Sequence, residues 1–287
     1  MSSVWKTISQ NVKLASLPDV YLRLRSVLDD PDSNLADVTD VVASDPALAA
    51  RLLRIVNSAY FGLDSEIDTI SRAVGLLGTQ EVHDLVLTAS MAHYFEGMSN
   101  DVMSMDKFWR RSVESAITTR ELAFLRDVLD SERLFVVGLL RDIGHLFIYQ
   151  LAPHEAQQAI ELSQRRNIPL HEAERSLLGA DYAEVGADLM RRLQLPRSLW
   201  EPAEFQLAPE KSQEYGMFTS LVHITACLLG GVERGLTVDE ALDEVSEHAW
   251  RVCGLTRKQC ARISDRVDPQ VAAVMRLIFP ALNASAA

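Results

Sequence analysis

The chain has 287 residues, of which 48% are hydrophobic and 24% are charged, a composition typical of a soluble globular protein. The formal net charge of −12 argues against nucleic-acid binding, because contacts with phosphate need a basic surface. No uninterrupted apolar run approaches the length that crosses a bilayer, and Lys6 and Lys13 interrupt any signal-peptide core. We therefore expect a cytoplasmic protein that binds neither membrane nor nucleic acid.

Most of the chain has the periodicity of helices. Asp45-Pro46 supplies an N-cap and a first-turn proline for a helix over 47–56, and Gly78-Thr79 opens another helix. No alternating run bounded by hairpin turns predicts a strand. The sequence therefore predicts an all-α fold of about a dozen helices. Three capping boxes mark further helix starts: Asp181-x-x-Glu184, Thr237-x-x-Glu240 and Thr256-x-x-Gln259.

A break in this periodicity at residues 97–106 is the best internal boundary. It predicts an N-terminal helical lobe over residues 11–96 and a second helical lobe over 97–287 that includes the C-terminal helices. We expect Gly230-Gly231 to end a helix of the second lobe.

Sequence signals of nucleophilic or phosphate-loop chemistry are absent. The chain has no Gly-x-Ser-x-Gly elbow and no glycine-rich phosphate loop. Cys227, Cys253 and Cys260 are odd in number and widely spaced, which argues against a disulfide framework or a zinc site. We expect buried, reduced thiols.

The segment 134–148 is apolar on every side of a helical wheel, apart from the adjacent ions Arg141 and Asp142. A helix without a polar face is buried. Charges rarely persist in such a setting unless they are paired or bind a metal, because removing them from water is costly. Some group in the fold must therefore neutralise Asp142.

Several motifs carry a family resemblance. They are DPALAARLLRIVNSAYFG at 45–62, AVGLLG at 73–78, FWRRS at 108–112, GLLRDIG at 138–144, DYAEVGA at 181–187 and LQLP at 193–196. In this order they resemble the HDOD domain (HD-related output domain), a degenerate member of the HD superfamily of metal-dependent phosphohydrolases. The resemblance covers most of residues 14–230 and implies one HDOD unit with an N-terminal helical lobe and an HD-like helical lobe.

The resemblance also identifies the positions at which HD enzymes hold their metal. Only one of them keeps a ligand of the expected kind, the carboxylate of Asp142. A guanidinium cannot ligate a cation, and a lone carboxylate is no site for a transition metal. We therefore expect no metal, no cofactor and no catalytic residue. The degenerate positions are Arg111, Arg141, Asp142, Tyr182, Phe205, Gln206 and Ala226.

Arg111 is a candidate replacement for the metal. If it faces Asp142, the two would form a largely buried ion pair with fork geometry. Truncating Arg111 would then leave a buried charge unpaired, at about 3–5 kcal/mol. In an alternative arrangement, Arg141 pairs with a downstream glutamate, and the sequence does not separate the two.

Two histidines lie near acids in the sequence. His145 follows Asp142 by three residues and could complete a two-ligand remnant, although a single helix histidine is more often structural. His83-Asp84 lies in the first lobe, where we expect an exposed helix feature.

Asn57, Tyr60 and Arg110 form a candidate interaction surface. Asn57 and Tyr60 also have a structural interpretation, because Asn57 with Ser58 can close a helix end while Tyr60 seats the following turn.

The resemblance implies a non-catalytic module of bacterial signal transduction, a pseudoenzyme that acts through protein–protein contacts. Its implied partners are a histidine kinase, a response regulator or a cyclic-di-GMP enzyme. One alternative is a metal-dependent phosphohydrolase, for example a cyclic-dinucleotide phosphodiesterase with rearranged ligands. A third interpretation is a sensor that binds an anionic small molecule at the lobe junction through Arg110 or Arg111.

Overall fold

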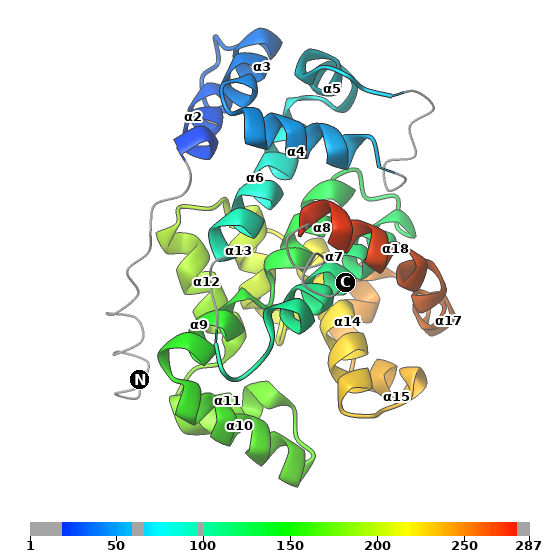
Figure 1. Cartoon of the computed structure of the whole chain (residues 1–287). Helices are drawn as coiled ribbons and strands as arrows, with labels where there is room; N and C mark the ends of the chain where they lie inside the picture. Colours follow the sequence, from blue (N-terminus) through cyan, green and yellow to red (C-terminus); the bar gives the residue numbers. More distant parts are fainter. Residues whose placement is uncertain (1–18, 59–65, 97–99, 280–287) are drawn as a thin grey trace. The chain divides into compact units, whose positions relative to one another are not determined.

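A computed structural model describes residues 19–58, 66–96 and 100–279, with the backbone alone for 92–96. Every regular element in these ranges is a helix, which confirms the all-α prediction (Figure 1). The described residues form two compact units. Of the described residues, the N-terminal unit contains those from 19 to 96 and from 269 to 279, and the C-terminal unit contains residues 100–268.

The N-terminal unit is built around α6. This helix is buried on several sides, with Val82, Val86 and Leu87 fully inaccessible, because α2, α4 and α5 all pack against it. Asp45 caps α4 and Pro46 occupies its first turn, as predicted. The helices are α2 Asp19–Leu28, α3 Leu35–Ala43, α4 Pro46–Val56, α5 Ile70–Leu77 and α6 Thr79–Glu96.

The prediction that His83 and Asp84 are exposed is wrong. Their side chains are 6% and 5% accessible, and His83 Nδ1 lies 3.0 Å from Asp84 Oδ1. Tyr21 of α2 packs its ring 5.2 Å from the imidazole. The pair is buried because α6 is the central helix of its unit, so that this part of α6 presents no face to water.

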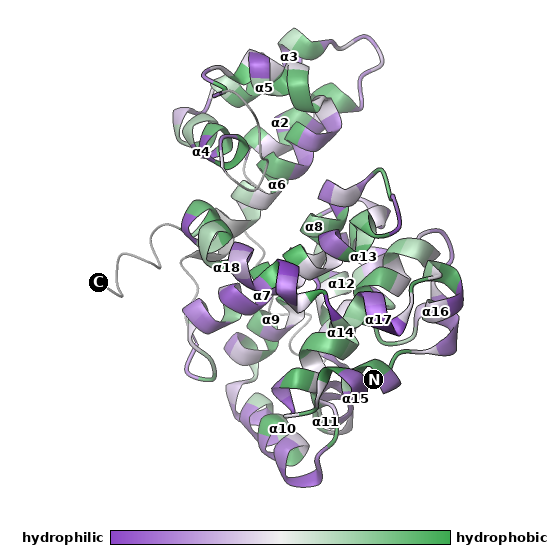
Figure 2. Ribbon diagram, turned by 90° about the vertical axis from the view of Figure 1, so that its right-hand side faces the viewer, coloured by the Kyte–Doolittle hydropathy of each residue, from purple (hydrophilic) through white to green (hydrophobic). Residues whose placement is uncertain are grey.

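The C-terminal unit packs α7, α8, α9, α12, α13 and α14 around a shared core. In Figure 2, α14 is coloured mostly as hydrophobic, whereas α10 carries both hydrophilic and hydrophobic residues. The predicted capping boxes at Asp181, Thr237 and Thr256 are all present. The helices are α7 Met105–Phe124, α8 Ser131–Leu140, α9 Ile143–Leu151, α10 Pro153–Arg166, α11 Leu170–Leu178, α12 Tyr182–Arg192, α13 Arg197–Glu204, the 3-10 helix η1 Pro209–Lys211, α14 Gly216–Glu233, α15 Val238–Asp243, α16 Glu247–Cys253 and α17 Arg257–Ala261.

Two glycines allow helices of this unit to approach closely. A Cβ at Gly138 of α8 would lie 2.7 Å from the Ser115 carbonyl oxygen of α7. A Cβ at Gly144 of α9 would lie 2.0 Å from the Tyr182 carbonyl oxygen of α12. Both distances are far below van der Waals contact, so only glycine permits these backbone contacts.

Three details of the expected organisation differ from the structure. Helix α18 (Ser264–Ile278) crosses from one unit to the other, and the chain from Pro269 groups with the N-terminal unit rather than with residues 97–268. Gly230-Gly231 lies inside α14 instead of ending it, because Gly231 packs against Ala241 of α15. The described residues contain more helices than the dozen expected because α15, α16 and α17 are short.

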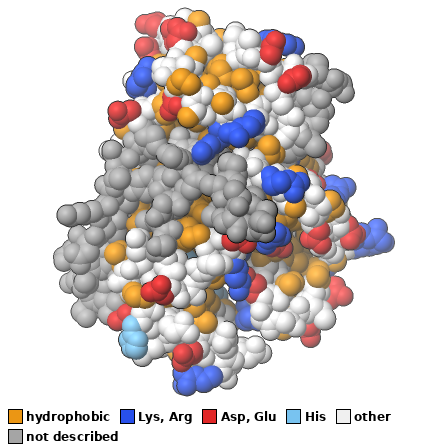
Figure 3. Space-filling model, in the orientation of Figure 1, with side chains coloured by type: hydrophobic (Ala, Val, Ile, Leu, Met, Phe, Trp, Pro, Cys, Tyr) orange, Lys and Arg blue, Asp and Glu red, His pale blue; other side chains and the backbone are white. Residues whose placement is uncertain are grey.

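Two stretches, Ser131–Leu151 and Gly216–Glu233, are apolar and long enough to cross a membrane by length and composition alone. In the structure most of their residues are buried, as in the core helices of a folded domain. Acidic and basic side chains are interspersed on the face shown in Figure 3.

Candidate functional site

The degenerate metal positions lie within the C-terminal unit. Arg111 lies on α7, Arg141 and Asp142 form the turn between α8 and α9, Tyr182 opens α12, and Gln206 follows α13. The apolar segment 134–148 is therefore not one continuous helix, because the chain turns at the two charged residues. This turn brings the Asp142 carboxylate back toward α7.

Asp142 contacts two guanidinium groups through one of its oxygens. Arg111 Nε lies 3.1 Å and Arg141 Nη2 lies 2.9 Å from Asp142 Oδ2. The Asp142 side chain is 1% exposed, and within the described part of the chain its Oδ1 has no hydrogen-bond partner. Burial raises the pKa of the Asp142 carboxyl, but the charges of Arg141 and Arg111 outweigh burial and hold this pKa below its usual value.

Arg141 is the more deeply buried of the two cations, with 1% of its side chain exposed. Its Nε donates to Ser115 Oγ at 2.6 Å, and its Nη1 donates to Gln206 Oε1 at 2.7 Å. Gln206 Nε2 donates in return to the Arg141 carbonyl oxygen at 3.0 Å. Arg141 is thus held by α7, by its own turn and by the segment after α13.

Gln206 is itself fixed by the neighbouring helix α14. His223 Nδ1 lies 2.6 Å from the Gln206 carbonyl oxygen, and His223 Nε2 accepts a hydrogen bond from the Ser246 amide at 3.1 Å. One ring nitrogen therefore donates and the other accepts, which corresponds to the neutral imidazole. Burial lowers the pKa of His223, in agreement with this assignment.

Arg111 differs from Arg141 because 17% of its side chain is exposed and because it has a second acidic partner. Its Nη1 lies 2.7 Å from Oε2 of Glu233 at the end of α14. Burial lowers the pKa of Arg111, but Asp142 and Glu233 together raise it above its ordinary value, so the side chain remains a cation. The downstream glutamate considered as a partner for Arg141 therefore pairs with Arg111 instead.

Three aromatic rings lie beside this cluster in a nearly parallel stack. The His145 ring centroid is 4.2 Å from that of Tyr182 and 5.4 Å from that of Tyr149, with interplanar angles of 20° and 21°. His145 Nε2 lies 3.2 Å from Glu174 Oε1, and the other oxygen of Glu174 accepts from the Tyr182 amide at 3.0 Å. His145 thus faces Glu174 and does not combine with Asp142 as a pair of metal ligands.

A cavity of about 1000 Å³ opens beside the stack. It lies entirely within the C-terminal unit, so the structure does not place it at the lobe junction considered from the sequence. Arg111, Tyr149 and Tyr182 line it near the ion cluster, and Glu233 and Arg234 line it from α14. Its volume is at the upper end of the range for small-molecule sites.

The structure brings together five of the predicted positions, Arg111, Arg141, Asp142, Tyr182 and Gln206. Ala226 lines the cavity, whereas Phe205 does not.

Where the structure describes them, the residues of the predicted interaction surface do not line the cavity. Asn57 closes α4, and its amide exchanges two 2.6 Å hydrogen bonds with the Ile67 backbone. Arg110 is exposed on α7 and does not line the cavity. Tyr60 lies outside the described residues.

Three residues of the site were not predicted from the sequence: Ser115, Glu174 and Glu233. Ser115 lies one helical turn after Arg111, which is a weak signal that both face the same neighbour. Glu174 and Glu233 are ordinary acidic residues of helices, and no local pattern distinguishes them.

The donor set of the cluster does not suit a metal ion. The described residues contain no group of three or more His, Cys, Asp or Glu side chains arranged to hold one. Two guanidinium groups already neutralise the one surviving carboxylate at Oδ2. A divalent cation at this oxygen would meet two fixed positive charges and no imidazole, so the residues present do not fit the group that the HD superfamily uses.

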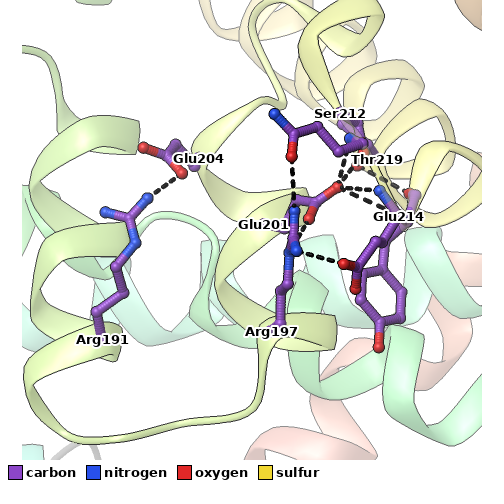
Figure 4. A network of polar contacts seen from close by, with 9 residues as sticks. Arg191, Arg197, Glu201, Glu204, Ser212, Glu214 and Thr219 are labelled. Atoms are coloured by element: carbon purple, nitrogen blue, oxygen red, sulfur yellow. Dashed lines mark hydrogen bonds and ion pairs between the residues drawn. The ribbon is translucent and has the colours of Figure 1, made fainter.

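A second buried carboxylate stabilises the segment between α13 and α14 (Figure 4). Glu201 Oε1 accepts hydrogen bonds from Ser212 Oγ and from the amides of residues 213, 214 and 215, at 2.7, 2.7, 2.8 and 3.2 Å. Its Oε2 accepts from Arg197 Nε at 2.5 Å. Burial opposes ionisation, but these donors lower the pKa of Glu201 to about 2.

The HDOD domain model matches residues 14–209. This chain belongs to the HDOD domain family. The HDOD match contains the whole ion cluster except Glu233.

Solved structures share the HDOD fold. One is an HDOD domain protein of unknown function from Geobacter sulfurreducens, at 24% identity, 96% coverage of both chains and a TM-score of 0.75. A proposed phosphohydrolase from Shewanella amazonensis SB2B matches at 23% identity over 96% of this chain and 97% of that one, with a TM-score of 0.71. A proposed signal transduction protein from Marinobacter aquaeolei VT8 matches at 22% identity over 94% and 60%, with a TM-score of 0.70. At these identities the likeness shows the fold alone.

A curated relative, an uncharacterized protein of Treponema pallidum (strain Nichols), is 25% identical over 214 residues. The match covers 73% of this chain but only 40% of the relative. The chain therefore spans less than half of that protein.

Proposed function

We propose that this HDOD protein is a non-catalytic regulatory module that acts through protein–protein contacts in a bacterial signalling pathway in the cytoplasm. A histidine kinase, a response regulator or a cyclic-di-GMP enzyme is the class of partner that this role predicts. The proposal rests chiefly on one observation: side chains of the chain itself, Arg111 and Arg141, neutralise the carboxylate that an HD enzyme would present to its metal.

The alternative, a metal-dependent phosphohydrolase, needs a cation that lowers the pKa of a bound water. Arg111 and Arg141 cannot ligate that cation, and Tyr182 and Gln206 fill two further family positions with groups that seldom bind transition metals. Tyr182 is also a poor source of a phenolate, because burial raises its pKa. The Marinobacter structure is described as that of a proposed signal transduction protein and the Shewanella one as that of a proposed phosphohydrolase, so these names alone do not decide between the two functions.

Metal analysis and a phosphodiesterase assay test the non-catalytic part of the proposal. The purified protein, loaded in turn with Mn²⁺, Fe²⁺ and Zn²⁺ and then dialysed, should retain less than stoichiometric metal. It should hydrolyse bis-p-nitrophenyl phosphate no faster than a buffer control. Stoichiometric metal together with turnover that Asp142→Ala abolishes would contradict the proposal.

A double variant tests why the metal is expected to be absent. Arg111→His with Arg141→His places two imidazoles beside Asp142 and removes both guanidinium charges, so metal affinity should rise measurably above wild type in calorimetric titration. Arg111→Gln with Arg141→Gln is the matched control, because it removes the same charges without supplying ligands. Equal affinities in the two variants, both above that of the wild type, would mean that charge alone excludes the metal, and no gain in either would contradict the explanation.

The regulatory part is tested by co-purification from a native lysate, followed by mass spectrometry. Signalling proteins recovered in defined stoichiometry would support the role. Recovery of the chain alone, at native concentration and in repeated preparations, would count against it.

A further inference from the structure

Tyr149 carries a buried hydroxyl that has no hydrogen-bond partner in the described part of the chain. The side chain is 2% exposed and lines the cavity beside the ring stack. Burial raises the pKa of Tyr149, so the group is a protonated donor at neutral pH. Buried polar groups are nearly always satisfied, so an unsatisfied hydroxyl on a residue that lines a cavity indicates a missing acceptor.

Arg111 lines the same cavity and could donate to the same acceptor. Its Nε contacts the buried carboxylate of Asp142, whereas its Nη1 contacts Glu233, whose side chain is 42% exposed. An ion pair with an exposed partner contributes little free energy and is readily exchanged. Glu233 therefore occupies a position on Arg111 that the oxyanion of a ligand can take.

The rest of the lining indicates the size and character of that ligand. Lys107 lies one helical turn before Arg111, lines the cavity, and makes no ion pair within the described residues. The stacked rings of His145, Tyr149 and Tyr182 supply flat surfaces, and apolar side chains such as Ile160 of α10 and Leu170 of α11 also line the cavity. Cations next to aromatic and apolar surface suit a ring that carries one anionic group.

We infer that this cavity binds a small aromatic oxyanion, either a carboxylate or a phosphate monoester. Arg111 and Tyr149 hold the anionic group, and Glu233 is the internal competitor that the ligand displaces. The site is independent of the signalling role proposed above, because it requires neither a partner protein nor a metal.

Calorimetric titration with phenyl phosphate and with benzoate tests the site and distinguishes the two sources of the anionic group. At least one of these probes should bind wild-type protein more tightly than phenol, inorganic phosphate or acetate, each of which lacks the ring or the anion. Failure of both probes to bind the wild type and the Glu233→Gln variant would overturn the inference. Tighter binding of benzylamine would also overturn it, because the site would then recognise a cation.

Three variants test the residues. Glu233→Gln should bind the preferred probe about fivefold more tightly, since it removes a competitor worth up to about 1 kcal/mol. Glu172→Gln is the matched control, because it removes another acid of the same cavity lining, whereas the ion pairs of Arg111 among the described residues are with Asp142 and Glu233; it should change affinity less than twofold. Equal gains in both variants would refute displacement from Arg111.

Tyr149→Phe should weaken binding about fivefold while leaving the melting temperature unchanged. Unchanged affinity would mean that Tyr149 does not contact the ligand.

Discussion

Asp142 and Glu201 are both buried carboxylates of the C-terminal unit, but their negative charges are satisfied in different ways. Glu201 uses both oxygens, one with Ser212 and three backbone amides, the other with Arg197. Asp142 uses one oxygen for two guanidinium groups, and its other oxygen has no hydrogen-bond partner among the described residues. Both oxygens of Glu201 therefore accept hydrogen bonds, whereas the charge of Asp142 is neutralised but only one of its oxygens has polar partners in the part of the chain that the structure describes.

The partners also differ in their separation along the chain. The donors to Glu201 lie 4 to 14 residues away, within α13 and the loop that follows it. Arg111 lies 31 residues from Asp142, and Arg141 is held by Gln206, 65 residues away. The Glu201 cluster is thus a local feature of one loop, whereas the Asp142 cluster depends on the packing of several helices. The following variants test this difference.

Arg141→Ala should have the largest effect. It removes the deepest cation and leaves Asp142, Ser115 and Gln206 without their shared donor, which should lower the free energy of unfolding by about 3–5 kcal/mol in urea titration. Arg110→Ala, an exposed neighbour of the cluster, is the control and should change stability by less than about 0.5 kcal/mol. A loss below 1 kcal/mol for Arg141→Ala would show that Asp142 does not depend on this cation.

Glu201→Ala should cost about 2–4 kcal/mol, because it leaves several buried donors of the loop unpaired. Since the pKa of Glu201 is about 2 when folded and lies near 4.5 when unfolded, the unfolded chain binds more protons between these values. The contribution of Glu201 is therefore complete above pH 4.5 and is lost as pH falls toward 2.

Urea titrations between pH 5 and pH 3 check this sign. The free energy of unfolding should fall more steeply with acid in the wild type than in Glu201→Gln. Glu204→Gln, a more exposed carboxylate of the same helix, should keep the wild-type slope. Parallel slopes for the wild type and Glu201→Gln would contradict the assignment.

Arg111→Ala should cost about 1.5–3 kcal/mol. This is less than the loss expected if Arg111 were the sole partner of Asp142, because Arg141 still contacts the same oxygen. Glu233→Ala should cost less than about 1 kcal/mol, since its side chain is partly exposed. Thermal and urea unfolding would rank Arg141→Ala, Arg111→Ala and Glu233→Ala by their loss of stability. A larger loss for Arg111→Ala than for Arg141→Ala would mean that Arg111 is the main partner of Asp142.

Tyr149→Phe should have the smallest effect on stability, near zero or slightly stabilising, because its hydroxyl has no hydrogen-bond partner in the part of the chain that the structure describes. Tyr182→Phe, its partner in the ring stack, removes a hydroxyl that donates to Gln206 at 3.4 Å and should cost about 0.5–1 kcal/mol. Equal melting temperatures for the two variants would mean that the Tyr182 hydrogen bond contributes nothing.

The sequence allowed the fold and the central ions of the site to be predicted because both leave local marks. Helix starts such as Asp45-Pro46 and Asp181-x-x-Glu184 are recognisable from a few neighbouring residues. The charges of Arg141 and Asp142 are recognisable because the residues around them are apolar. That contrast predicts a buried charge in need of a partner.

The rest of the site has no local mark. Glu233 contacts Arg111 only because α14 packs against α7. Nothing in the sequence distinguishes Glu201 from other helix glutamates, because its donors come from the loop that folds over it. The expected fork between Arg111 and Asp142 is also wrong, because Nη1 of Arg111 contacts Glu233 and only its Nε contacts Asp142. The prediction that His83 is exposed was wrong because the solvent access of a side chain depends on how the helices pack, not on the His-Asp pair itself.

The close contact at Gly144 fixes the backbone geometry of this site independently of the side chains around it. The backbones of α9 and α12 touch there, and even the methyl group of alanine would force the two helices apart. Because Asp142 lies two residues before that glycine, His145 follows it and Tyr182 supplies the opposing carbonyl, one backbone crossing sets the spacing between the turn and the rings. Side chains around the crossing can therefore be exchanged for others of different charge or reactivity while the framework that positions them stays in place.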